Sequence, residues 1–232
     1  MKTQFRLAIH PIPELERFDT SLRYTDILFG FVIRELFLRL QNWSQLDPDV
    51  KLHLLVGTTL VLGSWIGFRR SLYRSHYEVK FFNLPFFHFI IDQLMLILYF
   101  RIAVLTDQSG KQVLAVGNLA SATIKLVMYV FILYVVWDLL GMWIANAKTR
   151  GKGSEKKPLY PEIINSQMSD KEQPINWRGF LITLGSLGLI VLLWFVHNCF
   201  PPKGEFLAIV ALLLLYRWAK EVRTSCLLPQ PA

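Results

Sequence analysis

GNLASATIKLVMYVFILYVVWDLLGMW, residues 117–143, is the stretch of the sequence that decides the fold. It contains two charged residues, Lys125 and Asp138, and its apolar residues do not alternate with polar ones as they do in a barrel strand. A helix needs about 20 mostly apolar residues to cross a hydrocarbon core roughly 30 Å thick. The stretch therefore predicts a transmembrane helix that is long enough to tilt.

Five further segments approach the same length and composition. They cover residues 24–43, 52–68, 81–101, 177–199 and 205–222. The last segment is continuously apolar only as far as Tyr216, so it spans a bilayer only if Arg217 and Lys220 extend to the interface. The sequence predicts an all-α fold, a polytopic membrane protein with a bundle of six transmembrane helices, of which the first and last are the weakest.

The composition of the whole chain agrees with this interpretation. Of its 232 residues, 53% are apolar and 18% are charged, whereas soluble domains have about 45–50% and about 25%. This composition excludes a water-soluble globule and a disordered chain. Two cysteines are too few for a disulfide scaffold, a four-cysteine zinc site or an iron–sulfur cluster held by this chain alone.

The basic residues predict the orientation of the bundle. Of the 25 Lys and Arg residues, 18 fall on one side of the predicted membrane and five on the other. Since cytoplasmic loops carry the excess of Lys and Arg, both termini are predicted to be cytoplasmic. The chain then divides into a leader, four helices, a basic loop, two helices and a tail, with bounds 1–23, 24–146, 147–176, 177–222 and 223–232. The polar leader shows no signal peptide.

The net charge of +8 is explained by this topology, so no nucleic-acid partner is expected. The predicted partners are the lipid bilayer and, at the basic cytoplasmic loops, anionic lipid headgroups. A homo-oligomer is also considered, because a wide pore needs more helices than one chain has. No cofactor and no metal are predicted, and the plasma membrane or a bacterial inner membrane is the expected location.

Ionisable and polar residues at membrane depth are costly and mark functional sites. Arg34 and Asp92 lie near the midpoints of helices that run in the same direction, so we expect them to form an ion pair. Glu35 is expected to pair with Arg39 one turn later. Lys125 is expected to reach Glu35 or the outer interface. The full set of transport or gating candidates is Arg34, Glu35, His88, Asp92, Tyr99, Lys125 and Asp138.

Three of these candidates share one face of a predicted helix. His88, Asp92 and Tyr99 are spaced four and then seven residues apart. A histidine one turn before a carboxylate can relay protons, but two ligands are too few for a metal site. The alternative interpretation is that hydrogen bonds from this face only hold the bundle together.

Small residues form a second stripe, in the segment 52–68. Small side chains let helices approach closely or leave room for water, and close helix packing is the prediction here. The stripe contains Gly57, Gly63, Ser64 and Gly67.

The sequence lacks the motifs of the common catalytic, nucleotide-binding and metalloprotease sites, and it lacks a voltage sensor and a potassium filter. The polar residues of the first, third and fourth helices therefore favour a small ion channel, pore or transporter. One alternative is a membrane-anchored interaction subunit or signalling effector that uses the leader and the loop 147–176. An intramembrane enzyme centred on Glu35, His88 and Asp92 is the third possibility.

Overall fold

The structure is a computed structural model of the chain, and it describes residues 13–74, 82, 84–106, 118–151 and 177–225. These residues form helices and turns, with no sheet among them, which confirms the all-α prediction for this part of the chain. The six long helices are α1 (Pro13–Leu40), α2 (Pro48–Arg74), α3 (Leu84–Ala103), α4 (Leu119–Gly151), α5 (Trp177–Val196) and α6 (Pro202–Ser225). Two single-turn 3-10 helices, η1 (Trp43–Gln45) and η2 (His197–Cys199), precede α2 and α6.

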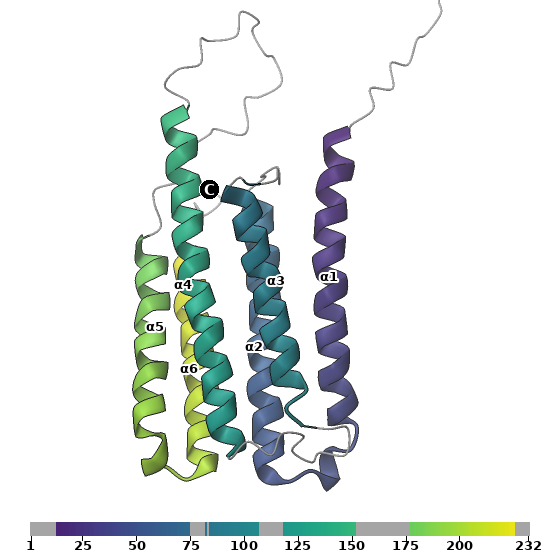
Figure 1. Cartoon of the computed structure of the whole chain (residues 1–232), viewed down its shortest axis with the longest axis vertical. Helices are drawn as coiled ribbons and strands as arrows, with labels where there is room; N and C mark the ends of the chain where they lie inside the picture. The colour runs from purple at the N-terminus through teal and green to yellow at the C-terminus, as the bar shows by residue number, and fades with distance from the viewer. Residues whose placement is uncertain (1–12, 75–81, 83, 107–117, 152–176, 226–232) are drawn as a thin grey trace, which may run out of the picture.

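The six helices run alternately up and down and form a flattened bundle (Figure 1). Helices α2, α3, α4 and α6 make the centre, α1 packs against α2 and α3, and α5 packs against α4 and α6. Helices α1, α3 and α5 begin, and α2, α4 and α6 finish, at the end drawn uppermost. We call this the basic end, because Arg69, Arg178 and Lys220 lie toward it.

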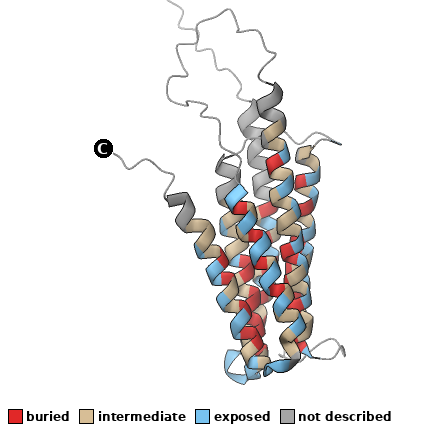
Figure 2. Ribbon diagram, turned by 90° about the vertical axis from the view of Figure 1, so that its left-hand side faces the viewer, coloured by how far each residue is buried: buried red, intermediate tan, exposed pale blue. Residues whose placement is uncertain are grey.

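Four helices are long and apolar enough to cross a membrane, which indicates a membrane protein. The spans are Pro48–Arg69, Phe86–Ala103, Leu119–Ile144 and Trp177–Val196. Helices α1 and α6 pack alongside these four helices and carry more charged residues than they do. Buried residues follow the inner faces of the helices, and exposed residues follow the outer faces (Figure 2).

The half of the bundle farther from the basic end is tightly packed, mainly by apolar side chains but also by the buried polar residues Arg39, His53, Thr106, Thr123 and Glu205. Gly57 lies in this region, where a Cβ atom would be 3.3 Å from the side chains of Ile102 and Leu36. That contact is of the close-packing kind expected for the small-residue stripe. The fully buried side chains here include Leu54, Val56, Ile102, Ile124, Val127, Phe206 and Ile209.

Candidate functional site

A cavity of about 380 Å³ lies among helices α1, α2, α3, α4 and α6, in the half of the bundle toward the basic end. This volume is within the range of small-molecule sites, about 300–1,000 Å³. Most of the wall is apolar. The polar side chains in the wall include Ser64, Asp92, Tyr99, Tyr134, Arg217 and Lys220. Two predicted candidates, Asp92 and Tyr99, therefore line a cavity, as does Ser64 of the small-residue stripe.

A row of hydroxyl groups crosses the cavity wall from α2 to α3. The hydroxyl of Ser64 donates to the carbonyl oxygen of Leu60 at 2.6 Å and also contacts the hydroxyl of Tyr134. The hydroxyl oxygens of Tyr134 and Tyr99 are 2.8 Å apart. These bonds satisfy buried polar groups in three helices and fix the two phenol rings.

Asp92 and His88 are held by one tryptophan of α4. The indole N–H of Trp137 donates to Asp92 Oδ1 at 2.9 Å. The imidazole of His88 packs against the same indole, with ring centroids 4.4 Å apart. Both residues are buried, so the face shared by His88, Asp92 and Tyr99 does point into the bundle. Asp92 and Tyr99 line the cavity, whereas His88 lies beside it.

Asp138 forms a second polar cluster at the edge of the cavity. Its carboxylate accepts hydrogen bonds from Lys220 Nζ, at 3.1 and 3.3 Å, and from the hydroxyl of Thr183. The Lys220 Nζ also lies 5.1 Å from the ring centroid of Tyr216. The cluster joins α4, α5 and α6, and it places the Lys220 charge inside the bundle rather than at the interface that the sequence predicts.

Arg217 lies along the small-residue stripe of α2. Its Cδ would be 3.7 Å from a Cβ atom at Gly63, and its Nη1 would be 2.5 Å from a Cβ atom at Gly67. These two glycines therefore make room for a guanidinium group and its stem. The neighbour at these two glycines is the Arg217 side chain of α6, which packs against α2 here.

The predicted ion pair between Arg34 and Asp92 is wrong. Arg34 Nη1 instead lies 3.3 Å from Glu35 Oε1, and its side chain is 64% exposed. Asp92 is buried against Trp137. The reason is the register of α1 against α3. Arg39 donates its Nε to the carbonyl oxygen of Thr106 at 2.7 Å, so Arg34 is level with about residue 101, roughly 14 Å along the helix axis from Asp92.

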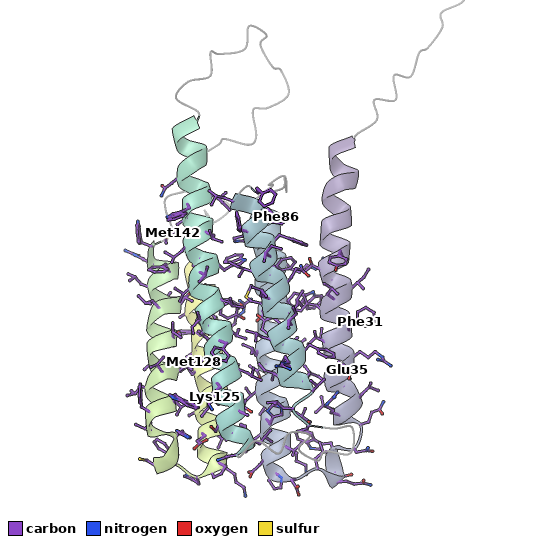
Figure 3. The ribbon with its side chains drawn as sticks, in the orientation of Figure 1. Phe31, Glu35, Phe86, Lys125, Met128 and Met142 are labelled. Carbon is purple, nitrogen blue, oxygen red and sulfur yellow. The ribbon has the colours of Figure 1, made fainter. Side chains whose placement is uncertain are left out.

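Two other expectations for charged residues have different outcomes. The bond between Glu35 and Arg39 is confirmed, with Arg39 Nη1 2.8 Å from Glu35 Oε2. Lys125 does not reach Glu35, because α2 and α3 separate the two residues (Figure 3). Its Nζ lies 4.8 Å from the ring centroid of Trp194 on α5, and the residue is exposed.

A buried histidine lies in the half of the bundle beyond the cavity. His53 Nε2 lies 3.0 Å from the carbonyl oxygen of Ile102, and His53 Nδ1 lies 2.8 Å from the hydroxyl of Thr123. These contacts join α2, α3 and α4, and the His53 ring also faces that of Phe206 on α6. His53 is not among the site residues predicted from the sequence, although a histidine in an apolar span itself indicates a buried polar site.

The roles of Tyr134, Trp137, Arg217 and Lys220 are likewise not evident from the sequence alone. Arg217 and Lys220 are three residues apart and share a helix face, which indicates a common environment.

The described residues contain no cluster of three or more His, Cys, Asp or Glu side chains that can hold a metal ion. The cavity thus presents two cations, Arg217 and Lys220, two carboxylates, Asp92 and Glu221, and a row of hydroxyls within an apolar wall. Comparisons with protein-family models, curated proteins and solved structures found no match.

Proposed function

We propose that this protein is a multi-pass membrane transporter that binds a small ligand in the cavity and moves it by alternating access. The observation that carries the proposal is the one-sided cavity. It lies toward the basic end, while packed side chains and the contacts of His53 fill the other half of the bundle. An open channel needs a continuous polar path through one chain or an oligomer, and the geometry favours a carrier over such a path.

Helices α1 and α6 contribute residues to the cavity wall, so the proposal places both in the membrane with the four apolar helices, and their outer faces support this placement. Ile27, Phe31 and Phe37 of α1 are 57–61% exposed, and Phe31 points away from the bundle (Figure 3). On α6, Leu215 and Trp218 are similarly exposed. Such apolar faces are stable in lipid rather than in water.

Several charges of α1 and α6 face other helices, whereas Arg34 is exposed and is paired with Glu35 of its own helix. Lys220 is bound to Asp138, and Arg69 is bound to Asp26 at 2.7 Å. These paired charges lower the hydropathy of their helices without exposing an unpaired charge to hydrocarbon. We further propose that the basic end is cytoplasmic, that the membrane is a plasma or bacterial inner membrane, and that anionic lipid headgroups surround this end.

Cysteine accessibility tests the carrier. In a variant with Cys199 and Cys226 replaced by serine, Thr59→Cys places a thiol in the cavity wall. A carrier reconstituted in liposomes is labelled at this position by an impermeant reagent from either side, because the cavity opens to each side in turn. Phe31→Cys, on the lipid-facing surface, is the matched control and remains unlabelled. Labelling of Thr59→Cys from the basic end alone, or from neither side, would reject alternating access.

A further inference from the structure

We propose that the cavity binds an anionic amphiphile, a molecule with a carboxylate or phosphate head on an apolar chain, and that Arg217 binds the head. This inference names the ligand class of the cavity on which the proposed function rests.

The Nε of Arg217 is buried and lacks a hydrogen-bond partner within the described residues. The nearest acidic oxygen, Glu221 Oε1, is 3.8 Å from Nε on the same helix, which is beyond hydrogen-bond distance. A guanidinium has five N–H donors that match the oxygens of a carboxylate or phosphate. Because a buried donor without an acceptor is costly, an anionic head in the cavity supplies what Arg217 lacks.

The other charged residues of the cavity wall are Asp92, Lys220 and Glu221. Glu221 lies one helical turn after Arg217, and its side chain is 41% exposed, so its carboxylate has access to solvent. Asp92 accepts the indole N–H of Trp137, and Lys220 is bound to Asp138. The positive charge of Lys220 is therefore largely neutralised by the carboxylate of Asp138. Arg217 is the lining group with an unmet hydrogen-bond demand, which is why we assign the head to this residue.

The rest of the wall suits an apolar chain. Phe29, Leu60, Met95 and Leu213 come from four helices and face the same cavity. The hydroxyls of Tyr99 and Tyr134 bond to each other and make few demands on a ligand. A sugar or a free phosphate leaves this apolar surface uncovered, whereas an acyl chain covers it.

The two glycines beside Arg217 fix where the head binds. The guanidinium occupies the space where a side chain at position 67 would lie, and its stem crosses position 63. Gly67→Ala therefore displaces the guanidinium while keeping its charge and the length of the helix. Because the displaced group is the far end of a flexible side chain, we expect this variant to fold.

Binding to the purified full-length protein tests the inference. The probes are oleate, phosphatidylglycerol, phosphatidylcholine and inorganic phosphate, each followed by native mass spectrometry and by the shift in Tm. We expect oleate, phosphatidylglycerol or both to bind, and Arg217→Gln to weaken that binding about tenfold or more, as loss of a charge-assisted hydrogen bond predicts. Gly67→Ala is expected to weaken it in the same direction. Arg178→Gln, which removes an exposed arginine at the same end, is the matched control and keeps wild-type affinity.

The two anionic probes distinguish a free fatty acid from a membrane lipid as the source of the ligand. Equal affinity of wild type and both cavity variants for oleate and phosphatidylglycerol overturns the role of Arg217. Binding of phosphatidylcholine or inorganic phosphate as tight as that of the anionic amphiphiles overturns the ligand class. Labelling of Thr59→Cys from both sides without amphiphile binding leaves the carrier standing and rejects this inference. Binding of an anionic amphiphile together with labelling of Thr59→Cys from the basic end alone would support this inference and reject the carrier.

Discussion

The indole N–H of Trp137 donates to the carboxylate of Asp92, with 2.9 Å between Nε1 and Oδ1, across the contact between α3 and α4. Asp92 is 5% exposed, so this bond serves a carboxylate that has little access to solvent. The same indole packs against His88. One side chain of α4 thus orients both polar groups of α3 that sequence analysis selected as a possible relay.

Trp137→Phe should destabilise the protein by about 1–3 kcal/mol, because it leaves a buried acceptor without its donor while keeping an aromatic ring against His88. Asp92→Asn should cost less, since the amide oxygen of asparagine still accepts the indole N–H. The measurement is the apparent Tm in detergent, followed by size-exclusion chromatography of heated samples. Trp143→Phe, at a tryptophan that is 63% exposed, is the matched control.

The same measurement tests the corrected partner of Asp92. If Arg34 were its partner, Arg34→Gln would lower Tm and would partly restore stability in the Asp92→Asn background. We expect neither effect, because Arg34 is exposed and bonds to Glu35. A rescue in the double variant would contradict the register of α1 and α3 described above.

The Asp138–Lys220 bond should show strong coupling. Both side chains are less than a quarter exposed, and the bond joins α4 to α6. Replacing one partner, as in Asp138→Asn or Lys220→Met, leaves a largely buried charge and should cost about 3 kcal/mol. The double variant should be less destabilised than the sum of the single variants. Additive losses in Tm across this cycle would mean that the two charges do not interact.

His53 should stabilise the closed half of the bundle through its two hydrogen bonds. His53→Leu fills a similar volume and removes both contacts of the imidazole. The hydroxyl of Thr123 still donates to the carbonyl of Leu119 at 2.8 Å, and the carbonyl of Ile102 still accepts from the backbone N–H of Leu105 at 3.4 Å, so a loss of about 1 kcal/mol is expected. His53→Gln can restore one of the imidazole contacts and should be the milder change. The apparent Tm, measured by size-exclusion chromatography of heated samples, ranks the stability of the two variants. Equal Tm values for His53→Leu and wild type would contradict a stabilising role of His53.

The sequence predicts the helices well because a bilayer imposes one simple requirement on length and polarity. The run around residues 117–143 coincides with most of α4. The sequence also predicts the ion pair between Glu35 and Arg39, because a separation of four residues within one helix determines that geometry. The sequence does not predict the register of one helix against another. Arg34 and Asp92 are at similar distances from the ends of their segments, yet α1 and α3 are offset.

The same limitation explains the missed site residues. Arg217 and Lys220 look like interfacial residues in a weak span, because nothing local says that one faces two glycines and the other an aspartate of α4. Trp137 resembles a membrane-interface residue until its position opposite Asp92 is known. Contacts between helices far apart in sequence decide these roles, so they follow from packing and not from periodicity.

The orientation of the bundle can be measured directly. In a background without Cys199 and Cys226, a cysteine at Ser109 should be labelled from outside intact cells, and a cysteine at Ser154 should not. Both positions lie outside the described residues, in connections that the charge distribution assigns to opposite sides. Labelling at Ser154 alone would invert the topology, and labelling at both would reject six spans.

Ion flux gives the last prediction, because it separates a carrier from the channel that the His88–Asp92–Tyr99 face first suggested. Protein-containing liposomes should hold a potassium diffusion potential about as well as protein-free ones, since Val127, Phe206 and Ile209 are buried in the half of the bundle beyond the cavity. His88→Ala and Asp92→Asn, each first shown to be folded by its Tm, should leave this low permeability unchanged. A steady current in wild type that falls in Asp92→Asn would show that ions pass this face, and the proposal of a carrier would then give way to a channel.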